Sequence, residues 1–430
     1  MTASTEITSV TGHRRWDSRA RPTVEVVVRT PAGTGRALAP AGASTGSGEA
    51  VDLRDGGEAF GGKDVTRAVA GVNGDIAAAL TGMDVADQAA VDARLEEVDG
   101  EAGFARLGGN AAVAASMAVA QAAAVAHGVP LWRHLDPAAA RLPLPEIQIF
   151  GGGAHAHGRL DIQDLLVVPL AAGSFREAFD WTVEIHRAAG RWLDERGRLA
   201  GVAEEGGWWP AFESNAEALE ALVAAIEGAG LVPGEQVGIS LDIAATQLVG
   251  SDGSYRLTRE DRTYDRDGWG EVLLGWLDRF PIVSIEDPFA EDDPAGMALL
   301  TAAVGDRVQV VGDDFLVTDA ERVRAAASDR TANTVLVKPN QAGTLTRAKA
   351  ALDAAAEAGF GAIVSARSGE TEDVTISHLA VGWGSGGFKV GSATRGERTA
   401  KWNELLRIEE NLGPSARYAG RAGLGPWQSR

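Results

Sequence analysis

The 430-residue chain contains no cysteine, which excludes disulfide bonds, cysteine metal ligands and thiolate nucleophiles. Lysine is scarce as well. Of 40 basic residues only five are lysine, namely Lys63, Lys338, Lys349, Lys389 and Lys401. Arginine keeps its proton in proteins, whereas a desolvated lysine can release it. Because arginine supplies most of the positive charge, the few lysines are candidates for places where a titratable amine is required.

Acidic residues also outnumber basic ones, and the formal net charge is −20. Such a balance disfavours nucleic acid and anionic membranes as partners, because both require a basic face. The first residues, MTASTEITSV, lack the basic and then apolar pattern of a signal peptide. The longest apolar stretch, residues 111–126, is mostly alanine and is interrupted by Ser116 and Gln121, which favours a buried helix over a membrane span. We therefore expect a cytoplasmic protein.

Two regions differ in their hydrophobic pattern. The segments ITSVTG, TVEVVVRT and TGRALAP alternate with the period of strands, and helical periods follow from about residue 65 to 125, which predicts a small α+β domain over 1–135. The proline-containing segment 129–145 marks the expected boundary. Over 136–430 apolar strand candidates alternate with helices, and eight candidates predict a modified (β/α)8 TIM-like barrel of the α/β class. Residues 174–230 hold two helical stretches with no strand between them, so we expect an irregular start to the barrel.

Most of these barrel strands end in a polar residue, which defines a polar series. Asp242 ends ISLD, and the series continues with Glu286, Asp313, Lys338, Arg367 with Ser368, and Lys389. From Glu286 onward the steps are 27, 25, 29 and 22 residues, about one strand and one helix each. Functional side chains of a parallel barrel gather at the C-terminal ends of its strands. Any one acid could merely cap a helix, but three carboxylates and two lysines at one mouth predict a magnesium site with an amine base.

The chain resembles the enolase family from about residue 6 to residue 412. The resemblance is carried, in order, by SRARPTVEV, AGASTGSGEAVDLRDG, GGNAAVAASMAVA, SIEDPFAEDD, VGDDFLVTDAERV, LVKPNQAGTLT, RSGETEDVTISHLAVG and RGERTAKWNELLRIEENLG. It implies a small N-terminal domain with a mobile GASTG loop, packed on a catalytic barrel, and usually a homodimer. It also implies two magnesium ions, the second bound with substrate, and chemistry on a phosphorylated three-carbon acid at the carbon next to its carboxylate.

The resemblance assigns roles to individual residues. The first metal would be held by the three acids of the series, and the second with help from the loop serine: Asp242, Glu286, Asp313 and Ser44. Lys338 matches the general base, whose pKa the metals and Lys389 would lower, and Lys389 matches the lysine that neutralises the substrate carboxylate. Glu205 matches the acid that assists departure of the β-hydroxyl. The remaining matches are the phosphate contacts Arg367 and Ser368 and the active-site loop histidine, His155.

The chain departs from the family in its active-site loops. Ala366 stands where enolases have histidine, and Asp164 stands at a catalytic glutamate position. The loop after AEEGG carries Trp208 and Trp209, and the loop of His155 carries His157, which we interpret as surface, and Arg159. Retained metal and lysine positions with altered loops favour the same chemistry on a changed substrate.

These departures lead to a specific expectation about the substrate. The space at Ala366 would accept a larger phosphorus group, and Arg159 would meet an additional carboxylate. Enolase-like enzymes of phosphonate biosynthesis, such as carboxyphosphonoenolpyruvate synthase, handle such a phosphonylated acid. Three alternatives stay open: a housekeeping enolase that converts 2-phosphoglycerate to phosphoenolpyruvate, an acid-sugar dehydratase or racemase, and a non-catalytic enolase-like binding protein. The GASTG loop and RSGETED disfavour the second, and retention of Lys338 disfavours the third.

Overall fold

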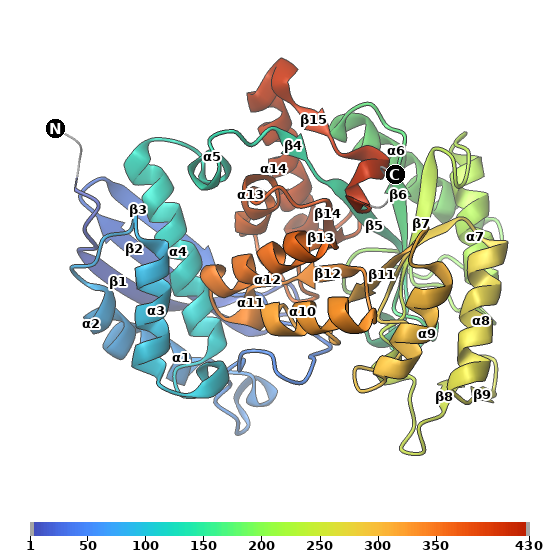
Figure 1. The fold of residues 1–430 in the computed structure, drawn as a ribbon, viewed down its shortest axis with the longest axis horizontal. Helices are drawn as coiled ribbons and strands as arrows, with labels where there is room; N and C mark the ends of the chain where they lie inside the picture. Colours follow the sequence, from blue (N-terminus) through green and yellow to red (C-terminus); the bar gives the residue numbers. More distant parts are fainter. Residues whose placement is uncertain (1–3, 427–430) are drawn as a thin grey trace.

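The computed structural model describes residues 4–426, which form an N-terminal α+β part beside a barrel (Figure 1). An antiparallel meander opens the chain, as its alternating pattern predicts, and consists of β1 (Ser9–Trp16), β2 (Pro22–Thr30) and β3 (Gly33–Leu38). Helices then cover one face of this sheet. Their bounds are α1 (Thr66–Gly71), α2 (Ala77–Leu80), α3 (Gln88–Asp99), α4 (Gly109–His127) and α5 (Leu131–Leu135).

The central helix of this part, α4, packs directly on β2 and β3. Its alanine-rich sequence lets the backbones approach closely, and a Cβ added at Gly35 of β3 would lie 2.0 Å from the Ala118 carbonyl oxygen. By length and composition α4 could cross a membrane. Most of its side chains are buried inside the protein, as is typical of a core helix.

Eight strands close the barrel, which confirms the predicted fold. Their bounds are β5 (Leu144–Gly151), β6 (Asp164–Pro169), β7 (Val237–Asp242), β10 (Ile282–Glu286), β11 (Gln309–Gly312), β12 (Thr334–Val337), β13 (Gly361–Ser365) and β14 (Gly387–Gly391). β6 runs antiparallel to both β5 and β7, and the other pairs are parallel. A short loop suffices to join β5 to β6 because antiparallel neighbours need no crossover helix.

The barrel helices lie outside the strands (Figure 1). Between β6 and β7 the chain forms two helices without a strand between them, as expected for residues 174–230. The bounds are α6 (Phe175–Asp194), α7 (Asn215–Gly228), α8 (Arg266–Arg279), α9 (Pro294–Val304), α10 (Ala320–Asp329), α11 (Pro339–Ala342), α12 (Leu345–Ala358), α13 (Thr375–Gly382) and α14 (Gly396–Leu412). Two short strand pairs lie outside the barrel: β4 (Arg141–Leu142) with β15 (Arg417–Tyr418), and β8 (Tyr255–Leu257) with β9 (Arg262–Tyr264).

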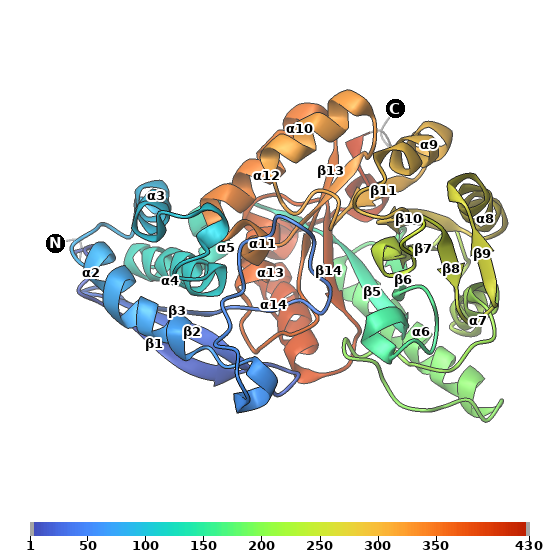
Figure 2. The same ribbon diagram turned by 90° about the horizontal axis from the view of Figure 1, so that it is seen from below.

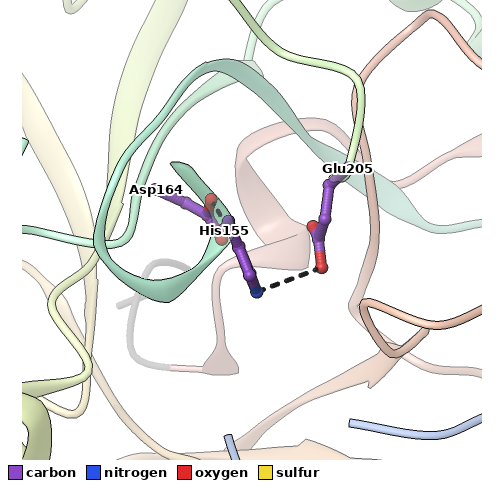
Figure 3. Close-up of side chains that lie close together, drawn as sticks. All are labelled: His155, Asp164 and Glu205. Carbon is purple, nitrogen blue, oxygen red and sulfur yellow. Dashed lines mark hydrogen bonds and ion pairs between the residues drawn. The ribbon is translucent and has the colours of Figure 1, made fainter. Parts of the chain in front are cut away.

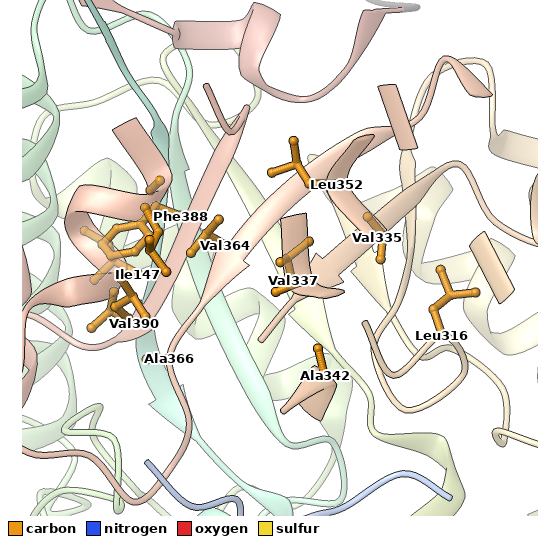
Figure 4. Packing of buried hydrophobic residues seen from close by; sticks show 14 of the residues in the cluster. Ile147, Leu316, Val335, Val337, Ala342, Leu352, Val364, Ala366, Phe388 and Val390 are labelled. Atoms are coloured by element: carbon orange, nitrogen blue, oxygen red, sulfur yellow. The ribbon is translucent and has the colours of Figure 1, made fainter. Parts of the chain in front are cut away.

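The two-residue period of the strands decides which side chains face the barrel interior. Phe388 and Val390 belong to the main hydrophobic core together with residues of the surrounding helices (Figure 4). Lys389 lies between them in β14, so its side chain is directed to the opposite side, into the barrel. Leu336 and Ile363 form a separate apolar cluster with Val311, as expected for interior positions one strand apart.

The segment after β3 crosses from the N-terminal part to the barrel (Figure 2). Ala41 and Gly369 exchange two backbone hydrogen bonds of 2.9 Å, which fix this segment against the loop that follows β13. The N-terminal part therefore contributes the loop of Ser44 to the mouth of the barrel. We propose that the boundary between the two domains lies after residue 135, where α5 ends.

Candidate active site

The structure gathers most of the predicted residues around one enclosed space at the C-terminal ends of the barrel strands. The residues lining it that the sequence singled out are Ser44, His155, Asp164, Glu205, Asp242, Lys338, Ala366, Arg367, Ser368 and Lys389. Glu286 and Asp313 lie directly behind this lining and contact the two lysines. Arg159 does not line the space.

Lys389 joins two of the predicted metal ligands. Its Nζ donates to Asp242 Oδ2 at 2.8 Å and to Glu286 Oε2 at 2.7 Å, and all three side chains are buried. Burial alone would lower the pKa of Lys389, but Asp242 and Glu286 outweigh this effect and raise the pKa well above its usual value. Burial, and next the Asp242 charge, raise the pKa of Glu286. Lys389 is therefore a permanent cation at the base of the site.

Lys338 and Asp313 form the second lysine–carboxylate pair. Lys338 Nζ donates to Asp313 Oδ2, and Gln341 Nε2 donates to Asp313 Oδ1 at 3.0 Å. The backbone N–H groups of Asp313 and Asp314 donate to the Asp287 carboxylate at 2.9 and 2.8 Å, which orients the turn that follows β11. Burial alone would lower the pKa of Lys338, but the Asp313 carboxylate raises it above its usual value. In this arrangement the expected lowering of the Lys338 pKa is thus outweighed by Asp313.

These carboxylates fit a hard divalent cation such as magnesium. All donors are oxygens from three neighbouring strand ends, which is the ligand type that magnesium prefers. Among the described residues Glu286 Oε1 is buried without a hydrogen-bond partner, so one of its lone pairs is free to coordinate an ion. Asp242, Glu286 and Asp313 would hold the ion.

The candidate phosphate contact Arg367 is buried and held by several acceptors. Its guanidinium donates to both Glu49 carboxylate oxygens, with distances of 3.0 and 3.2 Å, to Asn340 Oδ1 at 3.1 Å and to the Ser44 carbonyl oxygen at 3.0 Å. Ser368 Oγ accepts from the Ala43 N–H at 2.8 Å. The loop of Ser44 is thereby tied to the two residues expected to bind phosphate.

Helix α14 positions the backbone of this phosphate loop. Arg398 is buried, and its guanidinium donates to the carbonyl oxygens of Arg367 and Ser368. Lys401 Nζ donates to the Thr371 carbonyl oxygen at 2.8 Å and lies 2.9 Å from the Glu370 carboxylate. Lys401 is therefore a third buried lysine, whose contacts are structural.

His155 lies between two acids that also line the space, Asp164 and Glu205 (Figure 3). Its Nδ1 is 3.1 Å from Asp164 Oδ1, and its Nε2 is 3.7 Å from Glu205 Oε1. Burial lowers the pKa of His155, but the charges of Asp164 and Glu205 outweigh this and raise the pKa to about 9. Burial raises the pKa of Glu205. Gln148 Nε2 also donates to Asp164, and its Oε1 accepts from the Gly207 N–H at 2.8 Å, which links β5 to the loop of Glu205.

The raised pKa of His155 predicts a pH-dependent stability. Because the folded-state pKa of about 9 exceeds the unfolded value, protonated His155 stabilises the fold fully below about pH 6.5, and this contribution is lost as the pH rises through 9. Replacing His155 with Asn keeps a donor toward Asp164 but removes the charge. The difference in unfolding free energy between wild type and H155N should be about 3 kcal/mol larger at about pH 6 than at about pH 9.5.

Denaturant unfolding at the two pH values measures this difference, and the exposed neighbour His157, changed to Asn, is the matched control. A difference between wild type and H155N that does not change with pH would show that His155 is uncharged in the folded protein.

Arg159 is where the structure departs from the predicted site. Its Nε donates to the Trp209 carbonyl oxygen at 2.6 Å, and its Cζ lies 5.6 Å from the centroid of the Trp209 ring. The side chain is therefore engaged with the neighbouring loop and does not face the cavity. An arginine in a short Gly-containing turn gives no sequence signal that distinguishes these two orientations.

Sequence reasoning also missed several polar residues of the site. Glu49 lies in the polar loop that follows Ser44, and nothing in that loop distinguishes it from the other acid or hydroxyl residues. Glu146 is buried in β5, where its Oε2 accepts from Ser240 Oγ at 2.8 Å, and burial raises its pKa. The sequence does mark Glu146 as unusual, because it is the lone acid within the apolar run LPEIQIF.

The enclosed space has a volume of about 20 Å³, enough for about one water molecule. Pockets that enclose small ligands usually measure a few hundred Å³, so the space as it stands in this structure is too small for a three-carbon acid. A larger groove of about 780 Å³ lies at the opposite end of the barrel, below the starts of β13 and β14, and none of the predicted site residues line it.

Comparisons with known proteins agree with this architecture. Residues 7–135 match the family model of the enolase N-terminal domain, and residues 139–425 match that of the enolase C-terminal TIM barrel domain. The chain is 48% identical over 417 residues to enolase 1 of Desulfitobacterium hafniense strain Y51, covering 96% of this chain and 95% of that protein. It is 47% identical over 425 residues to the enolase of Rubrobacter xylanophilus, covering 98% and 99%. The chain therefore belongs to the enolase family of enzymes.

Proposed function

We propose that the protein catalyses the magnesium-dependent dehydration of 2-phosphoglycerate to phosphoenolpyruvate. The observation that carries the proposal is that Lys338, Glu205 and Arg367 all line one enclosed space. Both of the similar proteins named above are enolases, and the similarity extends over nearly their whole length. A lysine, an acid and a phosphate-binding arginine are the groups that this elimination requires.

Removal of the α-proton is assigned to Lys338. Its Nζ would take the proton from the carbon next to the substrate carboxylate, and the permanent charge of Lys389 would offset the negative charge that this carboxylate then gathers. A magnesium ion held by these carboxylates would supply further positive charge there, and Asp313, which raises the pKa of Lys338 in this structure, would be one of the residues that hold it. We propose two such ions in the working enzyme, with Ser44 near the second.

Departure of the β-hydroxyl is assigned to Glu205. Burial raises its pKa, which favours uptake of the proton that a general acid presents, and protonated His155, 3.7 Å away, opposes this effect. The C3–O bond breaks as the electron pair left at C2 forms the double bond, and the hydroxyl leaves as water with the proton from Glu205. Arg367 and Ser368 would hold the phosphate, because the guanidinium fork matches phosphate oxygens.

The structure lends less support to a specialised phosphonate substrate. That interpretation needs Arg159 beside an additional carboxylate, but Arg159 donates to the Trp209 carbonyl oxygen. Ala366 does line the cavity and is buried, yet the space around it is small. Similarity to two named enolases favours the housekeeping reaction. The composition supports a cytoplasmic location and the family resemblance supports a homodimer or a dimer-based homo-oligomer, and we propose both.

A steady-state assay tests the proposed function. Purified protein given 2-phosphoglycerate and Mg²⁺ should form phosphoenolpyruvate, followed by the absorbance of its conjugated double bond, with kcat in the usual range of about 1–10³ s⁻¹. Chelation of the metal should abolish turnover, and added Mg²⁺ should restore it. Absence of product from the metal-loaded protein would contradict the proposal and reopen the phosphonate interpretation.

A further inference from the structure

We infer that Arg159 and Trp209 form a latch that positions Glu205 against His155 for the elimination step. The inference rests on the proposed function, in which Lys338 removes the proton and Glu205 assists departure of the hydroxyl. It concerns two loops that flank the cavity, residues 152–163, which carry His155, and residues 201–209, which carry Glu205.

The latch lies away from the reacting groups and joins the two loops directly. Arg159 Nε donates to the Trp209 carbonyl oxygen at 2.6 Å, while its guanidinium carbon lies 5.6 Å from the indole centroid. A carbonyl hydrogen bond and a cation–π contact thus hold one side chain. The His157 ring, tilted by 54°, lies 6.1 Å from the same indole and covers another part of it.

Trp209 is in turn fixed to its own loop. Its backbone N–H donates to the Gly201 carbonyl oxygen at 3.2 Å, and a Cβ added at Gly201 would lie 2.9 Å from the indole nitrogen. The indole therefore packs on the glycine at the start of the loop. Trp209 therefore joins the two ends of the loop of residues 201–209. A displacement of Trp209 would change the position of the whole loop.

The adjacent residue anchors the loop to the barrel. Trp208 Nε1 donates to the His186 carbonyl oxygen at 3.0 Å, and its ring stacks on the His186 ring with a centroid distance of 4.8 Å. The Trp208 backbone N–H donates to Ile149 of β5 at 2.8 Å. In the loop of Glu205, Trp208 therefore packs against the barrel and Trp209 contacts Arg159 in the loop of His155.

Two further contacts connect the two loops directly, near the chemistry. The Glu204 N–H donates to the His155 carbonyl oxygen at 3.1 Å, and the ion pair of His155 with Glu205 measures 3.7 Å. The Glu205 carbonyl oxygen also accepts from the Ser392 N–H at 2.9 Å, and Gln148 bridges Asp164 and the Gly207 N–H, so the latch adds a further direct contact between the two loops. Lys338 lies after β12 and makes none of its hydrogen bonds to either loop, so proton removal should not depend on the latch.

The ratio of isotope exchange to elimination tests this assignment. In D₂O with Mg²⁺, Lys338 can return deuterium to the α-carbon of 2-phosphoglycerate before the hydroxyl leaves. R159A should slow elimination on the order of 10-fold while exchange continues, since a misplacement of 1 Å can cost about 100-fold and loosening a loop is a smaller disturbance. W209A should show the same raised ratio, W209F should retain the contact between ring and cation, and R159K should recover part of the loss.

The chain offers a matched control. Arg196 also stacks on a tryptophan, with its Cζ 4.0 Å from the Trp192 centroid, and also donates to that residue's carbonyl oxygen at 3.1 Å, but it lies outside the site. R196A should leave the exchange-to-elimination ratio at the wild-type value.

Each other outcome has a definite meaning. Equal loss of exchange and elimination in R159A, or no change in either, would overturn the latch. A raised KM with an unchanged ratio would overturn it as well, and would assign Arg159 to substrate binding. If R159A does not fold, W209A becomes the deciding variant and must then show the raised ratio. Wild-type protein that shows neither exchange nor elimination would instead refute the proposed function.

Discussion

Replacing Lys338 with alanine should abolish both deuterium exchange at the α-carbon of 2-phosphoglycerate and its dehydration. Removal of a general base typically costs about 10²–10⁴-fold in rate, and no other amine takes the place of this one. Lys389 is the other lysine that lines the space, and the Asp242 and Glu286 carboxylates raise its pKa well above its usual value, so it stays protonated. Initial rates of exchange and of product formation, measured on the same sample, check this prediction.

The matched control for K338A is Lys349→Ala. Lys349 is partly exposed on α12, where it pairs with Asp353 one turn along the helix, so its loss should leave both rates unchanged. Thermal unfolding of K338A establishes that the variant is folded, because removing Lys338 leaves the Asp313 carboxylate buried and without its lysine. Substantial exchange in a folded K338A would contradict the assignment of the base.

Replacing Glu286 with glutamine should remove magnesium binding and, with it, activity. The amide keeps the shape and can still offer one oxygen, but it loses the negative charge that a divalent ion requires. We expect the Mg²⁺ affinity and kcat/KM at fixed Mg²⁺ each to fall by about 100-fold or more, given that even indirect disturbance of metal ligands costs about 10–100-fold. Calorimetric titration of the substrate-free protein with Mg²⁺ gives the affinity without reference to turnover.

The corresponding control is Glu357→Gln on the surface of α12, where the side chain is 70% exposed. It makes the same chemical change far from the site and should alter neither Mg²⁺ binding nor rate. If E286Q bound Mg²⁺ as tightly as wild type, the metal would have to lie elsewhere. The acids Asp287 and Asp314 beside Asp313 would then be the next residues to test.

The barrel and its polar series were predictable because both follow from strand periodicity. Apolar, β-branched runs fix the strands, and the side chains that end successive parallel strands must meet at one edge. Asp242, Glu286 and Lys338 belong to this class of position. Their convergence needs only the strand order, which the regular spacing of strand and helix implies.

The loops were less predictable, because their geometry depends on tertiary contacts that have no sequence period. Arg159 was expected to face the substrate, yet a partner 50 residues away, Trp209, determines its direction. The bond of Glu49 to Arg367 spans 318 residues and joins the two domains. Glu146 shows a third limitation: a lone acid in an apolar strand signals an unusual interior, but its partner Ser240 lies two strands away.

The electrostatic state of the lysines was also beyond sequence reasoning. Lys389, one of the cations expected to lower the pKa of Lys338, does act in that direction, and so does Arg367. Direct contact with Asp313 outweighs them, and only coordinates can show which of these competing charges is nearest. The catalytic pKa of Lys338 therefore depends on what else the Asp313 carboxylate binds.

The most direct test of the central claim is a nuclear magnetic resonance time course of the wild-type protein with 2-phosphoglycerate and Mg²⁺ in D₂O. We predict that phosphoenolpyruvate accumulates while the remaining 2-phosphoglycerate loses its α-proton signal, because one lysine removes that proton and can return deuterium. If the α-proton signal and the substrate concentration both stay constant over a period that allows many turnovers at ordinary enzyme rates, the assignment of enolase chemistry to this site is contradicted.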